Sequence, residues 1–265
     1  MVQKEPTISL PKLQNSLSFA GVGVSTSTLS RRLKKELGLN FKSYKPAKKP
    51  RITSEMAKKR LEFAKRFLNY SKDDWDKVMY ESTIEQFGFR TKTVRRPANQ
   101  RINPRYIVQA MKHPGKQMIW ASMSSKGIGG LHFLTPGTTM NGKVYLDMLK
   151  EKLQVHMELH NAQILMHDGA PCHRSKIVSE WLQSNEIQVL PWPGNSPDCN
   201  PIENVWNILK NEVAQMRPTS ISQLNTCIKT VWKTKISSEF CKSLVHSMPR
   251  RLAAVIANKG YQTKY

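Results

Sequence analysis

The sequence predicts an α/β protein in which a mixed sheet flanked by helices follows a small helical module. Leucines recur at helical spacing before residue 40, and short apolar runs separated by Gly and Pro follow Trp75. Beyond residue 160, strand-like and helical segments alternate. Strands in series followed by alternating helices and strands are typical of a mixed sheet covered by helices. The 265 residues suffice for one sizeable core and one small module.

Residues 1–50 are predicted to form a helix-turn-helix module that binds DNA. A first helix is marked by apolar residues at helical spacing, Leu10, Leu13 and Leu17. Two glycines in FAGVGVS turn the chain, and Ser25 or Thr26 caps a second helix that runs to about Leu37. The polar and basic side chains available to a DNA groove are Ser25, Thr28, Arg31, Arg32, Lys34 and Lys35. A basic helical hairpin without DNA recognition is the alternative, because such patterns are short.

A basic linker follows this module. From Arg31 to Arg66 there are 14 Lys or Arg residues against three Glu. The segment SYKPAKKPRI adds Lys48, Lys49 and Arg51 to the predicted DNA-binding residues. Residues 51–72 are predicted as a linker helix, with its helical part from Ser54 to about Asn69.

Residues 73–265 are predicted as the main domain. Its first strands are KVMYES, QMIWASMSS and GGLHFLT, and a long amphipathic helix, TMNGKVYLDMLKEKLQVHMEL, comes next. AQILMHDG is a buried strand, RSKIVSEWLQSN a helix, IQVLPWP another strand and IENVWNILKNEVAQM the helix after it. This order places the carboxyl end of a central strand close to the start of a later helix.

Charge indicates a nucleic-acid partner. The formal net charge is +23, and no acidic residue occurs over residues 86–146, where ten Lys or Arg stand. No run approaches the roughly 18 apolar residues of a membrane span, and the N-terminus lacks a signal-peptide core, so we expect an intracellular protein without a membrane partner. Four scattered cysteines argue against a disulfide framework. His167, Cys172 and His173 lack the second ligand pair that a zinc site needs.

Asp168 and Glu203 are the predicted catalytic and metal-binding residues. Asp168 follows a buried strand in HDGAPCH, Glu203 begins a helix in SPDCNPIENVW, and 34 residues (169–202) separate them. Both can face one crevice, where two carboxylates suit Mg²⁺, with Mn²⁺ as a substitute. Structural roles are the alternative, because Asp168 can close a turn and Glu203 can favour the helix dipole.

These signatures, HDGAPCHRS and WPGNSPDCNPIENVWNILK, resemble those of the Tc/mariner superfamily of cut-and-paste DNA transposases, in the branch with catalytic Asp, Asp and Glu. The resemblance extends from about Thr7 to the C-terminus, and GVSTSTLSRRLKKELGL resembles the family's second helix-turn-helix. RLEFAKRFLNY resembles its linker helix and WDKVMYES its opening strand. The resemblance implies a ribonuclease H-like core and metal-dependent cleavage at transposon ends followed by strand transfer. It makes Asp168 and Glu203 the second and third catalytic acids.

Two departures from the family pattern predict impaired function. The family carries an Asp before the Glu-Ser pair matched by Glu81 and Ser82, whereas this chain has Tyr80 there, by substitution or by loss of a Ser-Asp step. A phenol is a poor Mg²⁺ ligand, and Glu81, the alternative third metal ligand, should point to the opposite face of the strand. The missing ligand predicts a rate loss on the order of a thousandfold or more. The family also has two helix-turn-helix units where this chain keeps one.

The sequence therefore predicts a catalytically impaired transposase that binds double-stranded inverted-repeat DNA. We expect a homodimer or association with an intact related transposase. RRLKK and KKPR favour import into the nucleus. The alternative is a non-catalytic, transposase-derived DNA-binding protein or an inhibitory partner of intact transposases. A general nuclease is a third interpretation, since one fold supports several functions.

Overall fold

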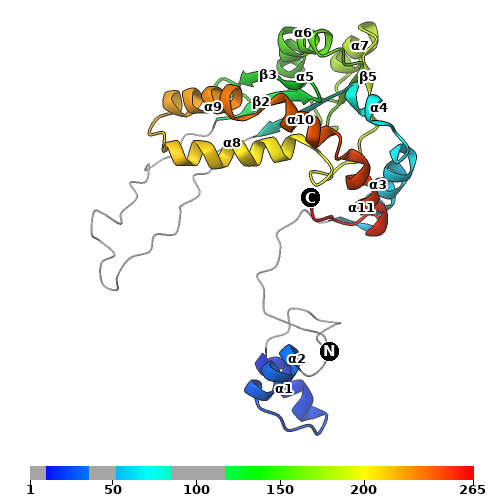
Figure 1. Ribbon diagram of the computed structural model, residues 1–265, viewed down its shortest axis with the longest axis vertical. Helices are drawn as coiled ribbons and strands as arrows, with labels where there is room; N and C mark the ends of the chain where they lie inside the picture. Colours follow the sequence, from blue (N-terminus) through cyan, green and yellow to red (C-terminus); the bar gives the residue numbers. More distant parts are fainter. Residues whose placement is uncertain (1–9, 36–51, 85–116) are drawn as a thin grey trace. The chain divides into compact units, whose positions relative to one another are not determined.

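The computed structural model describes residues 10–35, 52–84 and 117–265, and the chain divides into two units, Met1–Lys49 and Pro50–Tyr265. The first unit contains α1 (Leu10–Phe19) and α2 (Thr26–Lys35), which pack on each other (Figure 1). Leu13 and Leu29 are buried between them, as their spacing predicts. Both predicted helices are confirmed, although the predicted end at Leu37 lies outside the described residues.

The second unit is built on a five-stranded mixed sheet. Its strands are β1 (Val78–Ile84), β2 (Ile119–Ser124), β3 (Gly127–Phe133), β4 (Ile164–Met166) and β5 (Gln188–Val189), in the spatial order β3-β2-β1-β4-β5. β1 pairs antiparallel with β2, and β2 with β3. β1 pairs parallel with β4, and β4 with β5. The sequence-based fold class, a mixed sheet flanked by helices, is confirmed.

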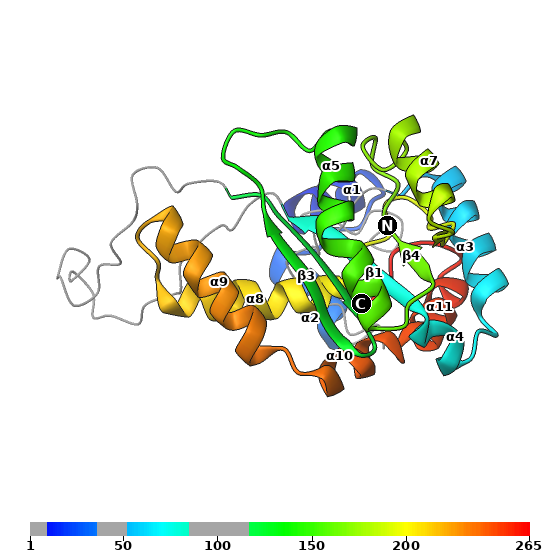
Figure 2. The same ribbon diagram turned by 90° about the horizontal axis from the view of Figure 1, so that it is seen from above.

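Helices cover both faces of this sheet (Figures 1 and 2). They are α3 (Ser54–Phe67), α4 (Lys72–Asp76), α5 (Gly142–Met148), η2 (Leu149–Leu153), α6 (Gln154–Leu159), α7 (Lys176–Ser184), α8 (Ile202–Met216), α9 (Ile221–Lys235), α10 (Ser238–Val245) and α11 (Met248–Ala257). The long helix predicted over residues 139–159 is interrupted, because η2 is a π-helical turn between α5 and α6. None of the described helices has the length and apolar character needed to cross a membrane.

Two separate cores lie on the two faces of the sheet. Successive residues of a strand point to opposite faces, and β1 shows this directly, since Met79 and Tyr80 belong to different cores. Met79 packs with Trp120, Tyr145 and the α5–α7 side of the sheet. Tyr80 belongs to the core that also contains residues of α3, α8 and α11, among them Trp206 and Leu252. A side chain on β1 is therefore assigned to one face or the other by its position in this alternation.

Candidate catalytic site

Asp168 lies two residues beyond the end of β4, in a tight turn. Gly169 has φ +70°, a conformation that glycine adopts without strain, and the Ala170 N–H donates to Asp168 Oδ1 at 3.0 Å. The same Oδ1 lies 3.1 Å from His173 Nδ1, and the Asp168 side chain is 68% exposed. The His173 contact, with the Ala170 N–H, holds the pKa of Asp168 below its usual range despite partial burial. Asp168 therefore presents an ionised carboxylate to solvent at the edge of the sheet.

Glu203 stands in the first turn of α8, where the sequence places it. Burial raises the pKa of this half-buried carboxyl group above its usual value. Lys210 and a hydrogen bond from the Ser82 side chain act in the opposite direction, and the negative charge of Asp168 acts with burial. Asp168 and Glu203 thus lie within electrostatic reach of each other, and the structure brings the predicted pair to one end of the sheet.

Glu81 points to the opposite face of β1, as the alternation predicts. Its side chain is 1% exposed and accepts two hydrogen bonds, from the Tyr145 hydroxyl at 2.6 Å and from Trp120 Nε1 at 2.5 Å. His173 Nε2 lies 3.6 Å from Glu81 Oε1, so the imidazole stands between the carboxylates of Glu81 and Asp168. Burial raises the pKa of Glu81, against the effect of His173. Glu81 supports the imidazole that contacts Asp168, and both its carboxylate oxygens already have donors.

Tyr80 is buried in the apolar core that contains Trp206 and Leu252. The side chain is 0% exposed, and its hydroxyl has no hydrogen-bond partner among the described residues. Burial raises the pKa of this phenol well above its usual value, and the charged groups acting on it are Arg251 and Asp76. The residue that was expected to replace the first catalytic acid is therefore a core residue.

His173 is the functional candidate that the sequence interpretation set aside. Burial acts to lower its pKa, but the carboxylates of Asp168 and Glu81 prevail and raise it. Its neighbour His167 has a pKa lowered to about 4, by burial first and then by the charge of His173. The sequence already indicated that these two side chains could meet, because His173 follows Asp168 by five positions in HDGAPCH.

Replacing Glu81 with Ala should destabilise the protein by about 3 kcal/mol, because the Tyr145 hydroxyl and the Trp120 N–H would both be left buried without an acceptor. Glu81→Gln is the matched control: it keeps one acceptor oxygen, so we expect a smaller loss. Urea denaturation followed by circular dichroism measures both. Equal losses in the two variants would contradict the role given to these hydrogen bonds.

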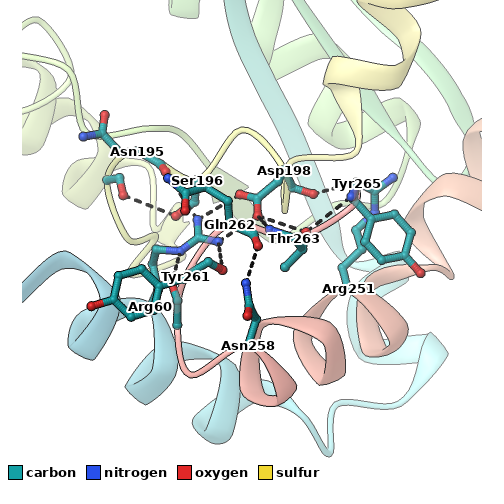
Figure 3. Close-up of polar contacts among 12 residues, drawn as sticks. Arg60, Asn195, Ser196, Asp198, Arg251, Asn258, Tyr261, Gln262, Thr263 and Tyr265 are labelled. Atoms are coloured by element: carbon teal, nitrogen blue, oxygen red, sulfur yellow. Dashed lines mark hydrogen bonds and ion pairs between the residues drawn. The ribbon is translucent and has the colours of Figure 1, made fainter. Parts of the chain in front are cut away.

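The loop before Glu203 is held by a buried clamp formed by Arg60 of α3, Asp198 and Thr263 (Figure 3). Arg60 Nη1 and Nη2 donate to the two Asp198 carboxylate oxygens at 2.9 and 2.8 Å, and Arg60 Nε donates to the Gly260 carbonyl at 2.8 Å. The backbone N–H and the hydroxyl of Thr263 donate to Asp198 Oδ2 at 2.9 and 3.0 Å. Such bidentate pairing fixes geometry as well as charge.

Arg251 of α11 extends this arrangement to the start of α8. Its Nη1 donates to the Asp198 carbonyl at 3.0 Å, and its Nη2 donates to Asn204 Oδ1 at 2.6 Å. Asn204 directly follows Glu203, so the first turn of α8 is tied to α11 and, through Asp198, to the linker helix α3. The sequence interpretation missed these contacts.

The predicted DNA-binding residues fall in the first unit and in the segment after it. Ser25 caps α2, since its Oγ accepts from the Thr28 N–H at 3.2 Å. Arg31 and Arg32 are exposed on α2, and Lys34 and Lys35 form its end. Three further predicted residues, Lys48, Lys49 and Arg51, lie outside the described residues. Within the described part of residues 86–146, Lys126 and Lys143 are exposed.

Asp168 and Glu203 are the predicted ligands of a divalent cation. The oxygen donors of Asp168 and Glu203 suit Mg²⁺ in kind. However, among residues 10–35, 52–84 and 117–265 there is no group of three His, Cys, Asp or Glu side chains placed to hold a metal ion.

Two family models match this chain. Residues 1–69 match a model described as a transposase, whose name refers to a Tc3-type helix-turn-helix. Residues 83–225 match a model described as a DDE superfamily endonuclease. The two matches cover the helix-turn-helix unit and both Asp168 and Glu203.

Similar proteins include transposases of nematodes. The chain is 30% identical to the Tcb1 transposase of Caenorhabditis briggsae over 269 residues, covering 99% of this chain and 97% of the relative. It is 32% identical to the Tcb2 transposase of the same species over 247 residues, covering 91% and 88%.

Solved structures agree with the fold. The structure described as the Mos1 transposase paired-end complex with left transposon end has a TM-score of 0.81 at 18% identity, covering 99% of this chain and 77% of that chain. The Mos1 mariner paired-end complex with Mn has a TM-score of 0.80 at 18% identity, covering 99% and 78%. This likeness confirms the predicted fold class, a small helical unit followed by a mixed sheet flanked by helices.

Proposed function

This chain belongs to the Tc1/mariner family of DNA transposases, and from that premise we propose that it binds transposon inverted-repeat ends while cutting and joining DNA weakly. The proposal of weak cutting and joining rests on the acidic residues at the candidate catalytic site. Asp168 and Glu203 interact electrostatically, yet the described residues offer no three-ligand group for a metal ion. The cation we propose for this pair is Mg²⁺, with Mn²⁺ as a substitute, and Mos1 structures solved with Mn and with Mg support it.

The proposed partner is double-stranded DNA, supported by the net charge of +23 and by the exposed Arg31 and Arg32 on α2. A homodimer, or a mixed assembly with an intact related transposase, is proposed because the Mos1 neighbours are described as paired-end complexes. The basic runs RRLKK and KKPR support a nuclear location.

Substituting both Arg31 and Arg32 with Ala should weaken binding to an inverted-repeat duplex and reduce its dependence on salt. Each lost phosphate contact lowers the slope of log affinity against log salt by about 1. Fluorescence anisotropy across a range of NaCl concentrations measures this slope. Lys126→Ala in the second unit is the matched control for a charge removed elsewhere, and an unchanged slope in the α2 variant would place the DNA contact outside that helix.

The proposed function is tested with a duplex that carries the inverted repeat adjoining this gene. We expect preferential binding to that duplex over a shuffled one, and cleavage in Mg²⁺ or Mn²⁺ that is close to the level of an Asp168→Ala blank. Equal affinity for both duplexes would favour a general nuclease or a non-specific DNA-binding protein. Rapid cleavage that Asp168→Ala abolishes would show that the acidic residues of the wild-type chain are sufficient for cleavage.

A second candidate function is an inhibitory or purely DNA-binding role, and the incomplete acid set favours it. Such a protein keeps the basic surfaces and the core while it does not need to cleave. Adding this chain to an active related transposase distinguishes the two functions. Suppression of that enzyme's cleavage at concentrations that do not saturate the DNA would indicate mixed assemblies rather than competition for sites.

A further inference from the structure

The register of β1 against β4 determines which β1 residue is level with Asp168. Tyr80 pairs with Met166 across these parallel strands. Counting two residues on from this pair brings Ser82 to the level of Asp168, which lies in the turn after β4. Ser82 keeps the face of Tyr80, because side chains alternate along a strand. Tyr80 and Met166 share one core, on the α8 side of the sheet. Ser82 therefore lies on the α8 side, at the level where β4 ends and Asp168 begins.

Glu203 reaches the same place from α8. This helix packs on β1, and its first residue, Ile202, is buried in the core that holds Tyr80. The interaction of the Ser82 side chain with the Glu203 carboxyl group, together with the charge of Asp168, is consistent with this placement. Ser82, Asp168 and Glu203 thus converge from a strand, a turn and a helix.

Exposure separates Ser82 from Tyr80. A group that holds a cation and meets a DNA phosphate must be open to solvent. Tyr80 is 0% exposed and is surrounded by core residues. Ser82 is half-buried and accessible. Glu81 is excluded as the position of the first acid, because its side chain points to the α5 side and both its carboxylate oxygens accept hydrogen bonds there.

The geometry points to Ser82, rather than Tyr80, as the position of the missing first acid, so that a carboxylate at residue 82 would complete a divalent-cation site with Asp168 and Glu203. This inference rests on the proposed function, since it takes the acid set to be that of a transposase. It also explains why the present set is incomplete: a neutral hydroxyl stands where a third negative oxygen donor is needed. The departure from the family pattern at Tyr80 is then explained by a shorter segment of β1 before Glu81 and Ser82, and not by replacement of the acid by Tyr80.

The test is Mn²⁺ binding to the full chain without DNA, measured by titration with electron paramagnetic resonance. Ser82→Asp should bind Mn²⁺ about tenfold more tightly or better than the wild type, because a third charged ligand is added. Ser82→Asn, of the same size and without charge, should remain at the wild-type level. The gain should disappear when Asp168→Ala is added. Equal affinities of Ser82→Asp and Ser82→Asn would overturn the inference, as would a gain produced by Tyr80→Asp.

A second variant keeps the test decisive if the crowded carboxylates of Ser82→Asp prevent folding. Ser82→Cys is nearly isosteric and supplies a thiolate, so Cd²⁺ should produce an ultraviolet charge-transfer band that is stronger than in the wild type. Asp168→Ala should weaken that band, and the absence of any added band would overturn the inference. Because no DNA is present, these outcomes are independent of end recognition. Failure to prefer the inverted repeat would count against the proposed function alone.

Discussion

Ser82→Asp is expected to raise the rate of strand cleavage at a transposon end in Mg²⁺ by about a thousandfold, which corresponds to about 4 kcal/mol of transition-state stabilisation. The reason is geometric. Ser82 is level with Asp168 in the parallel register, and its side chain interacts with the Glu203 carboxyl group. A carboxylate introduced there would join two acids that α8 and the turn after β4 already hold.

Single-turnover cleavage of an end-labelled duplex measures this gain, and three controls define it. Adding Asp168→Ala to Ser82→Asp should return the rate to the blank, because the new acid works only with the old pair. Tyr80→Asp should give no gain and should lower stability, since an acid would then lie in the apolar core that contains Trp206. Ser82→Asn distinguishes charge from size. A wild type that already cleaves as fast as Ser82→Asp would show that a third acid is unnecessary.

The positions of Asp168 and Glu203 could be predicted from sequence because each depends only on the neighbouring residues along the chain. An apolar strand followed by Asp-Gly ends in a turn, and a proline-braced loop followed by an apolar helix starts with the acid in its first turn. The position of the first acid could not be predicted in that way. Counting letters back from the Glu81-Ser82 pair selects Tyr80, whereas pairing β1 with β4 selects Ser82. Register is a property of two strands whose paired residues, such as Tyr80 and Met166, are 86 residues apart in sequence, and a single segment does not contain it.

The buried clamp was beyond sequence reasoning for a similar reason. Arg60 and Asp198 are 138 residues apart, and Thr263 lies a further 65 residues on. In sequence, Arg60 is one basic residue in the segment KKRLEFAKR, whereas the structure makes it the 1% exposed partner of a carboxylate. Composition predicted a basic linker helix, and it did not indicate that Arg60 faces the protein.

Arg60→Ala is expected to lower the free energy of unfolding by about 3–5 kcal/mol, the usual loss when one partner of a buried ion pair is removed. Asp198 is 7% exposed in the intact protein, and in Arg60→Ala its carboxylate would keep only the two Thr263 donors. Arg60→Lys is the matched control: it keeps the charge but not the two parallel N–H donors, so an intermediate loss is expected. Urea denaturation followed by tryptophan fluorescence measures both. A loss below about 1 kcal/mol would mean that the Arg60–Asp198 ion pair stabilises the protein no more than a solvent-exposed ion pair does.

The pH dependence of this loss identifies its electrostatic origin. Burial acts to raise the pKa of Asp198, but hydrogen bonds from Arg60 and Thr263 prevail and hold it below the usual value. A carboxyl group with a lowered folded-state pKa contributes stability above its unfolded pKa of about 3.9, and that contribution is lost as the pH falls through the folded-state value. The difference between wild type and Arg60→Ala should therefore be constant from neutral pH down to about pH 5 and shrink below about pH 4. Since Asp198 lies in the loop that leads into α8, the same change should loosen Glu203 and reduce the Mn²⁺ affinity gained by Ser82→Asp. A difference that stays constant at acid pH would assign the stability loss to lost packing of the Arg60 side chain instead.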